Sequence, residues 1–291
     1  IIIHTFASSL PRDASASAES SLAVLPSGPP RPLPESLGRH GMHETNFGTS
    51  IEYKGRALEL GVIAHRTEFS RPLNKSPTIY NMFDFLGSSN NNIGVFANYN
   101  FQNVSFFGEA SQTIGHGRGW IFGALAGVTR TVDVSLLVRR YDRDYYTFYS
   151  NAISENTSPK NETGVYWGWK HSINRKLSYT AYADVFTFPW MKFRSYQPSN
   201  GTETLLRITY RQSKSAEFFL QFRDERKARN YSTESPTYQV AMAARRNWVA
   251  GSSMTIGKLS LRQRVQWSSY RQASATRGFA IAFDAAYDWG R

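Results

Sequence analysis

The sequence predicts an all-β fold of about 12 to 14 strands that run up and down in one antiparallel sheet. Three observations favour this fold. Apolar and polar residues alternate with a period of two in recurring segments from Thr45 onward, and these segments fit helical spacing poorly. Tight turns and longer connections follow one another along the chain. Aromatic residues gather where several of the alternating segments end.

Composition narrows the class of protein. The chain has 291 residues, no cysteine, and a formal net charge of +12, which suits nucleic acid, anionic lipid or acidic polymers as partners. Its 16 Tyr, 19 Phe and 7 Trp are many for a soluble basic protein. No run approaches the roughly 18 apolar residues of a membrane helix. This excludes a helical membrane protein, whereas a transmembrane barrel needs only about ten alternating residues per strand.

Residues 1–44 differ from the rest of the chain. They are rich in Pro, Ser and Ala, show no sustained period, and include five prolines between positions 26 and 34. We expect an extended N-terminal segment without regular structure, acting as a plug of a barrel lumen or as a contact for a periplasmic partner.

From Thr45 onward, the alternation predicts thirteen strands in residues 45–291. They span 45–53, 57–66, 92–101, 104–113, 119–129, 132–140, 162–171, 177–188, 202–211, 216–226, 237–246, 259–269 and 278–288. In 259–269, for example, Leu259, Leu261, Val265 and Trp267 share one face, whereas Arg262 and Arg264 point to the other.

The connections indicate how the strands are joined. Tight turns at 54–55, 102–103 and 130–131 alternate with long connections at 67–91 and 141–161, although the rule weakens at 247–258. This pattern is typical of a transmembrane up-and-down β-barrel, with short turns on one side of the membrane and large loops on the other. A Greek-key sandwich has no reason to keep it. Because single-chain bacterial barrels usually have an even number of strands, we expect barrel sequence to be missing from one or both ends.

Charged residues recur on the polar faces of these strands. We interpret them as an ion-pair network lining the lumen, because an unpaired buried charge costs several kcal/mol. The predicted network comprises Glu162, Lys170, Asp184, Arg207, Arg211, Arg223, Arg262 and Arg264. The alternative is that Glu162 and Asp184 form a paired-carboxylate site.

Aromatic residues at strand ends predict belt positions at the membrane interface, where an amphipathic ring lies between lipid tails and headgroups. The predicted belt residues are Tyr141, Tyr145, Tyr146, Phe186, Phe188 and Trp190. An alternative for the segment 186–190 is a ligand platform, although Pro189 also suits the end of a ladder.

Three motifs occur in a characteristic order: "YDRDYYTFYSNAISE" at 141–155, "NETGVYWGW" at 161–169 and "YADVFTFPWMKFRSYQPSNG" at 182–201. An Asn-Glu-x-Gly opens a strand, an Asp-x-Phe-x-Phe-Pro-Trp closes the next, and a Pro-Ser-x-Gly loop follows. The matching residues are Asn161, Glu162, Gly164, Asp184, Phe186, Phe188, Pro189, Trp190, Pro198, Ser199 and Gly201.

This set resembles the barrel region of a Bacteroidota outer-membrane family whose members carry N-terminal competence-type helix-hairpin-helix repeats. The resemblance covers roughly residues 45–230. It implies an outer-membrane barrel. The helix-hairpin-helix part is not visible in this chain, so a DNA-binding role attached to those repeats is not implied.

We therefore expect an integral protein of the bacterial outer membrane that acts as a pore, a scaffold or a subunit of a translocation or transport complex. Its expected partners are membrane lipids, lipopolysaccharide and other outer-membrane or periplasmic subunits. One alternative is a barrel for DNA uptake, with nucleic acid following the basic lumen. Another is a soluble β-rich protein that binds a polyanion or glycan. No catalytic grouping, metal site or cofactor motif supports an enzyme.

The charge run 222–230 leaves a second question open. It follows an alternating segment, and it would serve either as a contact for nucleic acid or lipopolysaccharide or as a solvated loop at the barrel mouth.

Overall fold

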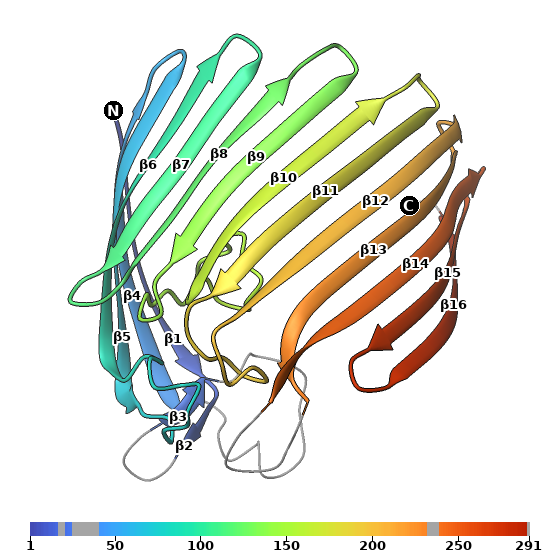
Figure 1. The fold of residues 1–291 in the computed structure, drawn as a ribbon. Coiled ribbons are helices and arrows are strands. Elements are labelled where there is room, and N and C mark those ends of the chain that lie inside the picture. Colours follow the sequence, from blue (N-terminus) through green and yellow to red (C-terminus); the bar gives the residue numbers. More distant parts are fainter. Residues whose placement is uncertain (17–20, 25–40, 232–238, 290–291) are drawn as a thin grey trace. The chain divides into compact units, whose positions relative to one another are not determined.

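The computed structural model describes residues 1–16, 21–24, 41–231 and 239–289 (Figure 1). The chain is all-β. Fourteen strands follow one another in an up-and-down antiparallel sheet, the arrangement from which β-barrels are built, in the order β1, β4, and then β5 to β16. Two short strands lie off this path, β2 pairing with β3 and β3 with β5. Over the described ranges, no helix is long and apolar enough to cross a membrane.

The strands are β1 (Ile2–Arg12), β2 (Ala14–Ala16), β3 (Ser21–Val24), β4 (Met42–Lys54), β5 (Leu58–Leu73), β6 (Gly87–Phe101), β7 (Val104–Thr113), β8 (Arg118–Gly127), β9 (Val132–Tyr141), β10 (Glu162–Ser172), β11 (Leu177–Phe188), β12 (Ser199–Ser213), β13 (Ala216–Asn230), β14 (Val240–Ile256), β15 (Leu259–Arg271) and β16 (Ala275–Tyr287). The thirteen predicted strands correspond one to one with β4–β16. The prediction of an all-β, up-and-down fold is therefore confirmed.

The series of short turns is more regular than the sequence indicated. Every second connection, beginning with 55–57 between β4 and β5, is a turn of two to four residues. The predicted irregularity at 247–258 is wrong, because β14 continues to Ile256 and only Gly257 and Lys258 form the turn. Gly257 adopts a φ of 59°, which glycine accommodates without a Cβ clash. The longest connections, 74–86 and 142–161, fall at the opposite strand ends from these short turns.

The N-terminal segment needs a correction. Its first residues were expected to lack regular structure, but β1 forms a full ladder with β4, from Ile2 opposite Glu52 to Arg12 opposite Met42. β1 is the first strand in the sheet order and is therefore an edge strand. An edge strand tolerates a proline such as Pro11, because the missing N–H removes no ladder hydrogen bond on the unpaired side. Residues 17–20 and 25–40, which include the prolines, lie outside the described residues.

Two compact units make up the chain. The first comprises Ile1–Phe101, Phe106–Phe122 and Arg139–Thr163, and the second comprises Gln102–Ser105, Gly123–Val138 and Gly164–Arg291. In the first unit, Ala14, Met42, Phe69 and Leu73 form a small buried cluster against which Phe85 packs.

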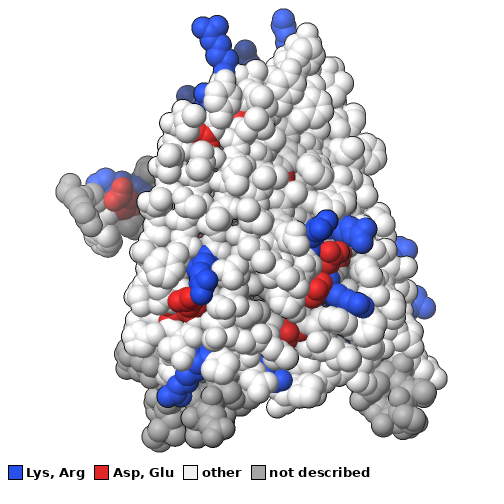
Figure 2. All heavy atoms as spheres, turned by 90° about the vertical axis from the view of Figure 1, so that its left-hand side faces the viewer, with Lys and Arg blue, Asp and Glu red and all other residues white. Residues whose placement is uncertain are grey.

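In the first unit, register sorts side chains onto two unlike faces. Ile3, Ile51, Val62 and Val95 form one cross-strand row, and Ile51, Val62 and Val95 are each about half exposed. The opposite face buries polar groups such as Glu44, Asn46 and Thr67. Figure 2, viewed from the side where β4–β6 lie in Figure 1, shows mostly uncharged side chains, with Lys and Arg at the upper rim and groups of both signs lower down.

The second unit has the same two faces, and its apolar and polar residues are more clearly separated. The outward row Phe222–Trp248–Trp267–Phe279 is followed on its short-turn side by the aliphatic row Leu220–Ala250–Val265–Ile281. On its other side comes the row Asp224–Arg246–Ser269–Arg277. The apolar band is thus bordered first by a row of aromatic rings and then by a row of charged and polar residues. The opposite face carries the polar residues.

Candidate functional site

In the first unit, the polar face is a layer of hydrogen-bonded side chains. Thr67 Oγ1 donates to Asn46 Oδ1 (2.8 Å), and Asn46 Nδ2 donates to Glu44 Oε1 (2.6 Å). Arg12 Nε completes the chain with a hydrogen bond of 3.1 Å to Glu44 Oε2. Strand alternation places these groups on one face because β1, β4 and β5 pair in a continuous register. The layer positions a carboxylate, an amide and a guanidinium with their bonds satisfied.

The connection 142–161 folds against this layer. The Tyr149 hydroxyl accepts hydrogen bonds from Arg12 Nη2 (2.9 Å) and Asn46 Nδ2 (3.3 Å). The Tyr146 amide donates to Thr113 Oγ1 (2.9 Å), and Asn90 Nδ2 donates to the Tyr146 carbonyl (3.1 Å). The backbone amide and carbonyl of Tyr146 are therefore both satisfied by strand side chains.

Glu162 organises the base of the same loop. Arg139 Nε donates to Glu162 Oε1 across 2.7 Å, and both side chains are fully buried. Glu162 also accepts from Ser154 Oγ (2.8 Å) and from the amide of Glu155 (2.9 Å to Oε2). Asn161, which precedes it, has a φ of 54°, a conformation that Asn tolerates better than most residues. Glu162 is thus an anchor for the loop rather than half of a carboxylate pair.

A second ion-pair group ties this loop to the connection 74–86. Asp84 pairs with Lys75 (2.9 Å) and with Lys160. Burial raises the pKa of the Asp84 carboxyl, but its hydrogen bonds to Lys160 and Lys75 outweigh burial and hold the pKa below its ordinary value. The two long connections are therefore joined while Asp84 is ionised.

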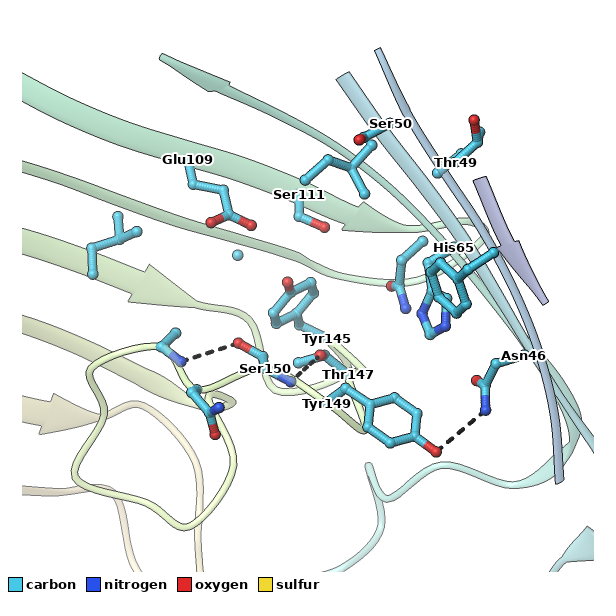
Figure 3. Close-up of a pocket in the computed structure, with 18 of the residues that line it drawn as sticks. Asn46, Thr49, Ser50, His65, Glu109, Ser111, Tyr145, Thr147, Tyr149 and Ser150 are labelled. Carbon is cyan, nitrogen blue, oxygen red and sulfur yellow. Dashed lines mark hydrogen bonds between the residues drawn. The ribbon is translucent and has the colours of Figure 1, made fainter. Parts of the chain in front are cut away.

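Between the loop and the strands of the first unit lies a cavity of about 860 Å³ (Figure 3). Phe6, His65 and Tyr149 form a run of rings along it, with centroid separations of 5.8 and 5.9 Å. Phe6 lies over Gly48, where a built Cβ would be 2.0 Å from the ring, so glycine makes room for this ring.

Three polar groups face the same part of the cavity. Figure 3 shows Glu109 and Ser111 of β7 turned toward it, with Tyr145 opposite them. Burial raises the pKa of the Tyr145 phenol, so the hydroxyl stays protonated as a hydrogen-bond donor. The arrangement suits a polar solute with an apolar body. Among the described residues, no group of three or more His, Asp or Glu side chains gathers to hold a metal.

The second unit holds most of the residues of the predicted lumen network. Arg223 donates two hydrogen bonds to Glu203 (2.9 and 2.6 Å), and Tyr182 donates a third. Arg211 and Arg207 approach Glu217 at 3.0 and 4.0 Å. Asp184 lies directly opposite Glu203 across β11 and β12 and is buried. The predicted network did not include Arg139, Glu203 or Glu217.

The remaining members of the network are less tightly held. Lys170 lies 3.9 Å from Asp133, and both side chains are more than half exposed. Arg264 donates to Gln266 (2.9 Å), and Arg262 stands opposite Asp284 in the ladder. Neighbouring strands bring these residues to one face, but close ion pairing is concentrated around Glu203, Glu217 and Glu162.

The predicted aromatic belts are wrong for most of their members. Phe186 and Phe188 are 0% and 2% exposed, and Tyr141 and Tyr145 are 4% and 8% exposed, so none of these rings faces a lipid phase. Phe186 packs over Gly201, and Lys192 Nζ lies 3.0 Å above the Phe188 ring. Tyr146 lies within the loop, 5.4 Å from Phe85 between ring centroids. Trp190 is half-buried just after β11.

The charge run 222–230 also needs a correction. It is not a loop, because β13 continues to Asn230 and pairs with β14 along its whole length. Its residues therefore alternate between faces, with Asp224 and Arg226 on the apolar side and Glu225, Lys227 and Arg229 on the polar side. The ladder with β14 extends the strand where sequence polarity alone indicated a loop.

No protein-family model matches this chain, and no curated protein matches it. The structure shows the all-β, up-and-down fold. Because no match assigns a function, the functional assignment rests on the residues of this chain.

Proposed function

We propose that this chain forms the wall of an integral outer-membrane β-barrel whose polar face lines a water-filled passage. The barrel would act as a pore, or as the barrel scaffold of a translocation or transport complex. One observation carries the proposal: the two faces of the sheet have the reverse of the burial expected for a soluble barrel. In β11, Val185 is 54% exposed, whereas its neighbour Asp184 on the opposite face is 6% exposed.

The size of the apolar band fits a bilayer. In the second unit, it runs from Trp248 to Ile256, from Leu259 to Trp267 and from Phe279 to Tyr287, nine residues in each strand. A tilted strand needs about 9–11 residues to cross the hydrocarbon core. The row of rings at its border is where belts of Trp and Phe are found, and the charged row with Asp224 and Arg246 (3.1 Å) follows it directly.

The ladder itself supports the same environment. In hydrocarbon, every strand N–H and C=O needs a partner, and antiparallel pairing supplies one within the sheet. Under this proposal, the outer edges of β1 and β16 also need hydrogen-bond partners within the membrane. Lipids and lipopolysaccharide are then the partners of the apolar face.

Two adjacent serines of β14 allow a matched test. Ser252 lies in the apolar band, in the row Phe218–Ser252–Gln263–Phe283, and Ser253 lies on the polar face between Glu217 and Arg262. Ser252→Arg places a guanidinium near the middle of the band and should lower stability in lipid vesicles by about 2–4 kcal/mol. Ser253→Arg gains Glu217 as a partner and should cost far less. Unfolding by urea in vesicles measures both.

The wild-type chain provides the second readout. It should sediment with membranes, require detergent for extraction and migrate faster on gels without boiling than after boiling. A monomeric, folded protein in buffer without surfactant, together with equal costs for the two serine variants, would reject the membrane assignment and favour a soluble β-rich protein. Conductance across planar bilayers then distinguishes an open pore from a scaffold.

A further inference from the structure

We propose that a basic cavity on the polar face of the second unit binds a phosphate-bearing solute. The cavity has a volume of about 520 Å³, within the range of small-ligand sites. Its lining includes five basic side chains and one acidic one. They are Arg194, Lys227, Arg229, Arg245, Arg277 and Glu225, of which Arg277 belongs by register to the row Asp224–Arg246–Ser269–Arg277 on the opposite face and is not counted in the binding site.

The register of β13 and β14 creates this cluster. Glu225, Lys227 and Arg229 alternate along the polar face of β13, so neighbouring members stand about 7 Å apart. Arg245 lies directly opposite Glu225. Ala243 faces Lys227 and Ala241 faces Arg229, and these small side chains leave the space that a larger residue would fill.

The cations exceed the available carboxylates. Glu225 is shared by Lys227 (3.2 Å) and Arg223 (3.4 Å). Among the described residues, no carboxylate comes within 4.0 Å of Arg229 or Arg245. Like charges on adjacent strands repel each other, so the folded cluster is destabilised until an anion lies among them. A multiply charged anion would relieve this repulsion.

Arg194 is held at the cavity by a constrained turn. Lys192 and Ser195 exchange backbone hydrogen bonds of 2.9 Å, and the Arg194 carbonyl accepts from the Asn230 amide (2.9 Å). Arg194 itself has a φ of 64°, which is unfavourable for a residue with a side chain. Backbone strain of this kind persists when the surrounding structure holds the residue in place, here at the end of β13.

The lining favours phosphate oxygens. Arginine forks match phosphate with paired, charge-assisted hydrogen bonds. Ser268, Tyr270 and Thr276 add hydroxyls to the same cavity. These groups lie on the opposite face from the row Phe222–Trp248–Trp267, so the bound phosphate belongs to a solute in water rather than to a lipid headgroup. The site itself needs only the folded polar face, and only the exclusion of a lipid headgroup rests on the membrane proposal.

Calorimetric titration of the full chain in detergent with inorganic pyrophosphate tests the site. We expect saturable binding that weakens as salt rises from 50 to 200 mM, roughly as for other phosphate contacts. The double substitution Arg229→Gln and Arg245→Gln should weaken binding by at least about tenfold. The matched control, Arg262→Gln with Arg264→Gln, removes two arginines from the same face at the short-turn end of β15 and should leave the affinity within about twofold.

Three results would overturn the proposal. The first is no saturable binding of pyrophosphate to the wild type at millimolar concentration. The second is an equal loss of affinity in the two double variants, which would indicate nonspecific attraction to a basic lumen. The third is binding of lipopolysaccharide micelles alone, abolished by Arg226→Gln with Arg246→Gln on the apolar side, which would make the ligand a lipid headgroup at a different surface.

Discussion

Arg139 Nε and Glu162 Oε1 lie 2.7 Å apart, and neither side chain has any exposed surface. An ion pair removed so completely from water is stable only when its remaining hydrogen-bonding capacity is satisfied. Glu162 meets this condition by accepting from Ser154 and from the amides of Glu155 and Asn156. The pair therefore connects β9 and β10 to the folding of the loop between them.

Arg139→Leu should destabilise the protein by about 3–5 kcal/mol, because it leaves the Glu162 carboxylate buried without its cation. Lys170→Leu is the control, since the Lys170–Asp133 pair is exposed and 3.9 Å long, and its loss should cost less than about 1 kcal/mol. Urea unfolding of the refolded protein measures both. Similar midpoints for the two variants would show that the buried pair contributes nothing beyond a surface contact.

Asp84 predicts a dependence of loop docking on pH. The folded carboxyl has a lowered pKa, so its links to Lys75 and Lys160 contribute stability at pH values above the unfolded pKa, near 4, and lose it as pH falls through the folded pKa. Hydrogen exchange over 74–86 and 142–161 should be slow at pH 6 and faster below about pH 4. Asp84→Asn should give fast exchange at both values. Exchange rates are corrected for the intrinsic effect of pH. Equal corrected rates at both pH values in the wild type would contradict the role of Asp84.

The strands were predictable because alternation is a local property of the chain. The predicted 104–113 and 177–188 match β7 and β11 at both ends. β1 was missed because small and polar residues such as Thr5, Ala7 and Ser9 occupy one of its faces, and only its ladder with β4 reveals it. The predicted strand 237–246 ended before β14 does for the same reason. Gly251, Ser252 and Ser253 are small or polar, and only their pairing with β13 and β15 shows that they belong to the strand.

The site was only partly predictable, for a different reason. Alternation assigns a face to each residue but does not show which distant strand supplies its partner, so Glu162 was identified without Arg139. Phe186 and Phe188 share the parity of Asp184, and that parity placed them on the polar face. Their position at a strand end suggested a membrane belt, and the local parity was the better signal.

Gly201 predicts a tight constraint next to this aromatic pair. A Cβ built there would lie 2.4 Å from Phe186 Cε2 and 2.7 Å from the Arg226 carbonyl oxygen, and the backbone oxygen cannot move aside. Gly201→Ala should therefore cost about 1–3 kcal/mol through overpacking. Gly278→Ala, where nothing lies within 4 Å, should be neutral or slightly stabilising. Chemical denaturation compares the two, and equal stability of both variants would rule out the packing of Phe186 on Gly201.

Tyr149 predicts how the loop 142–161 is held over the cavity. Tyr149→Phe removes the oxygen that accepts from Arg12 and Asn46, leaving Glu44 as the acceptor for both donors. The loss should cost about 1 kcal/mol and speed hydrogen exchange over 142–161, while the strand amides of β4 stay protected. Tyr53→Phe is the control, because the Tyr53 hydroxyl makes no hydrogen bond to a described residue. Unchanged exchange in Tyr149→Phe would mean that Phe148, which packs at 5.1 Å from Phe69 and 5.3 Å from Phe85 between ring centroids, holds the loop without the hydroxyl.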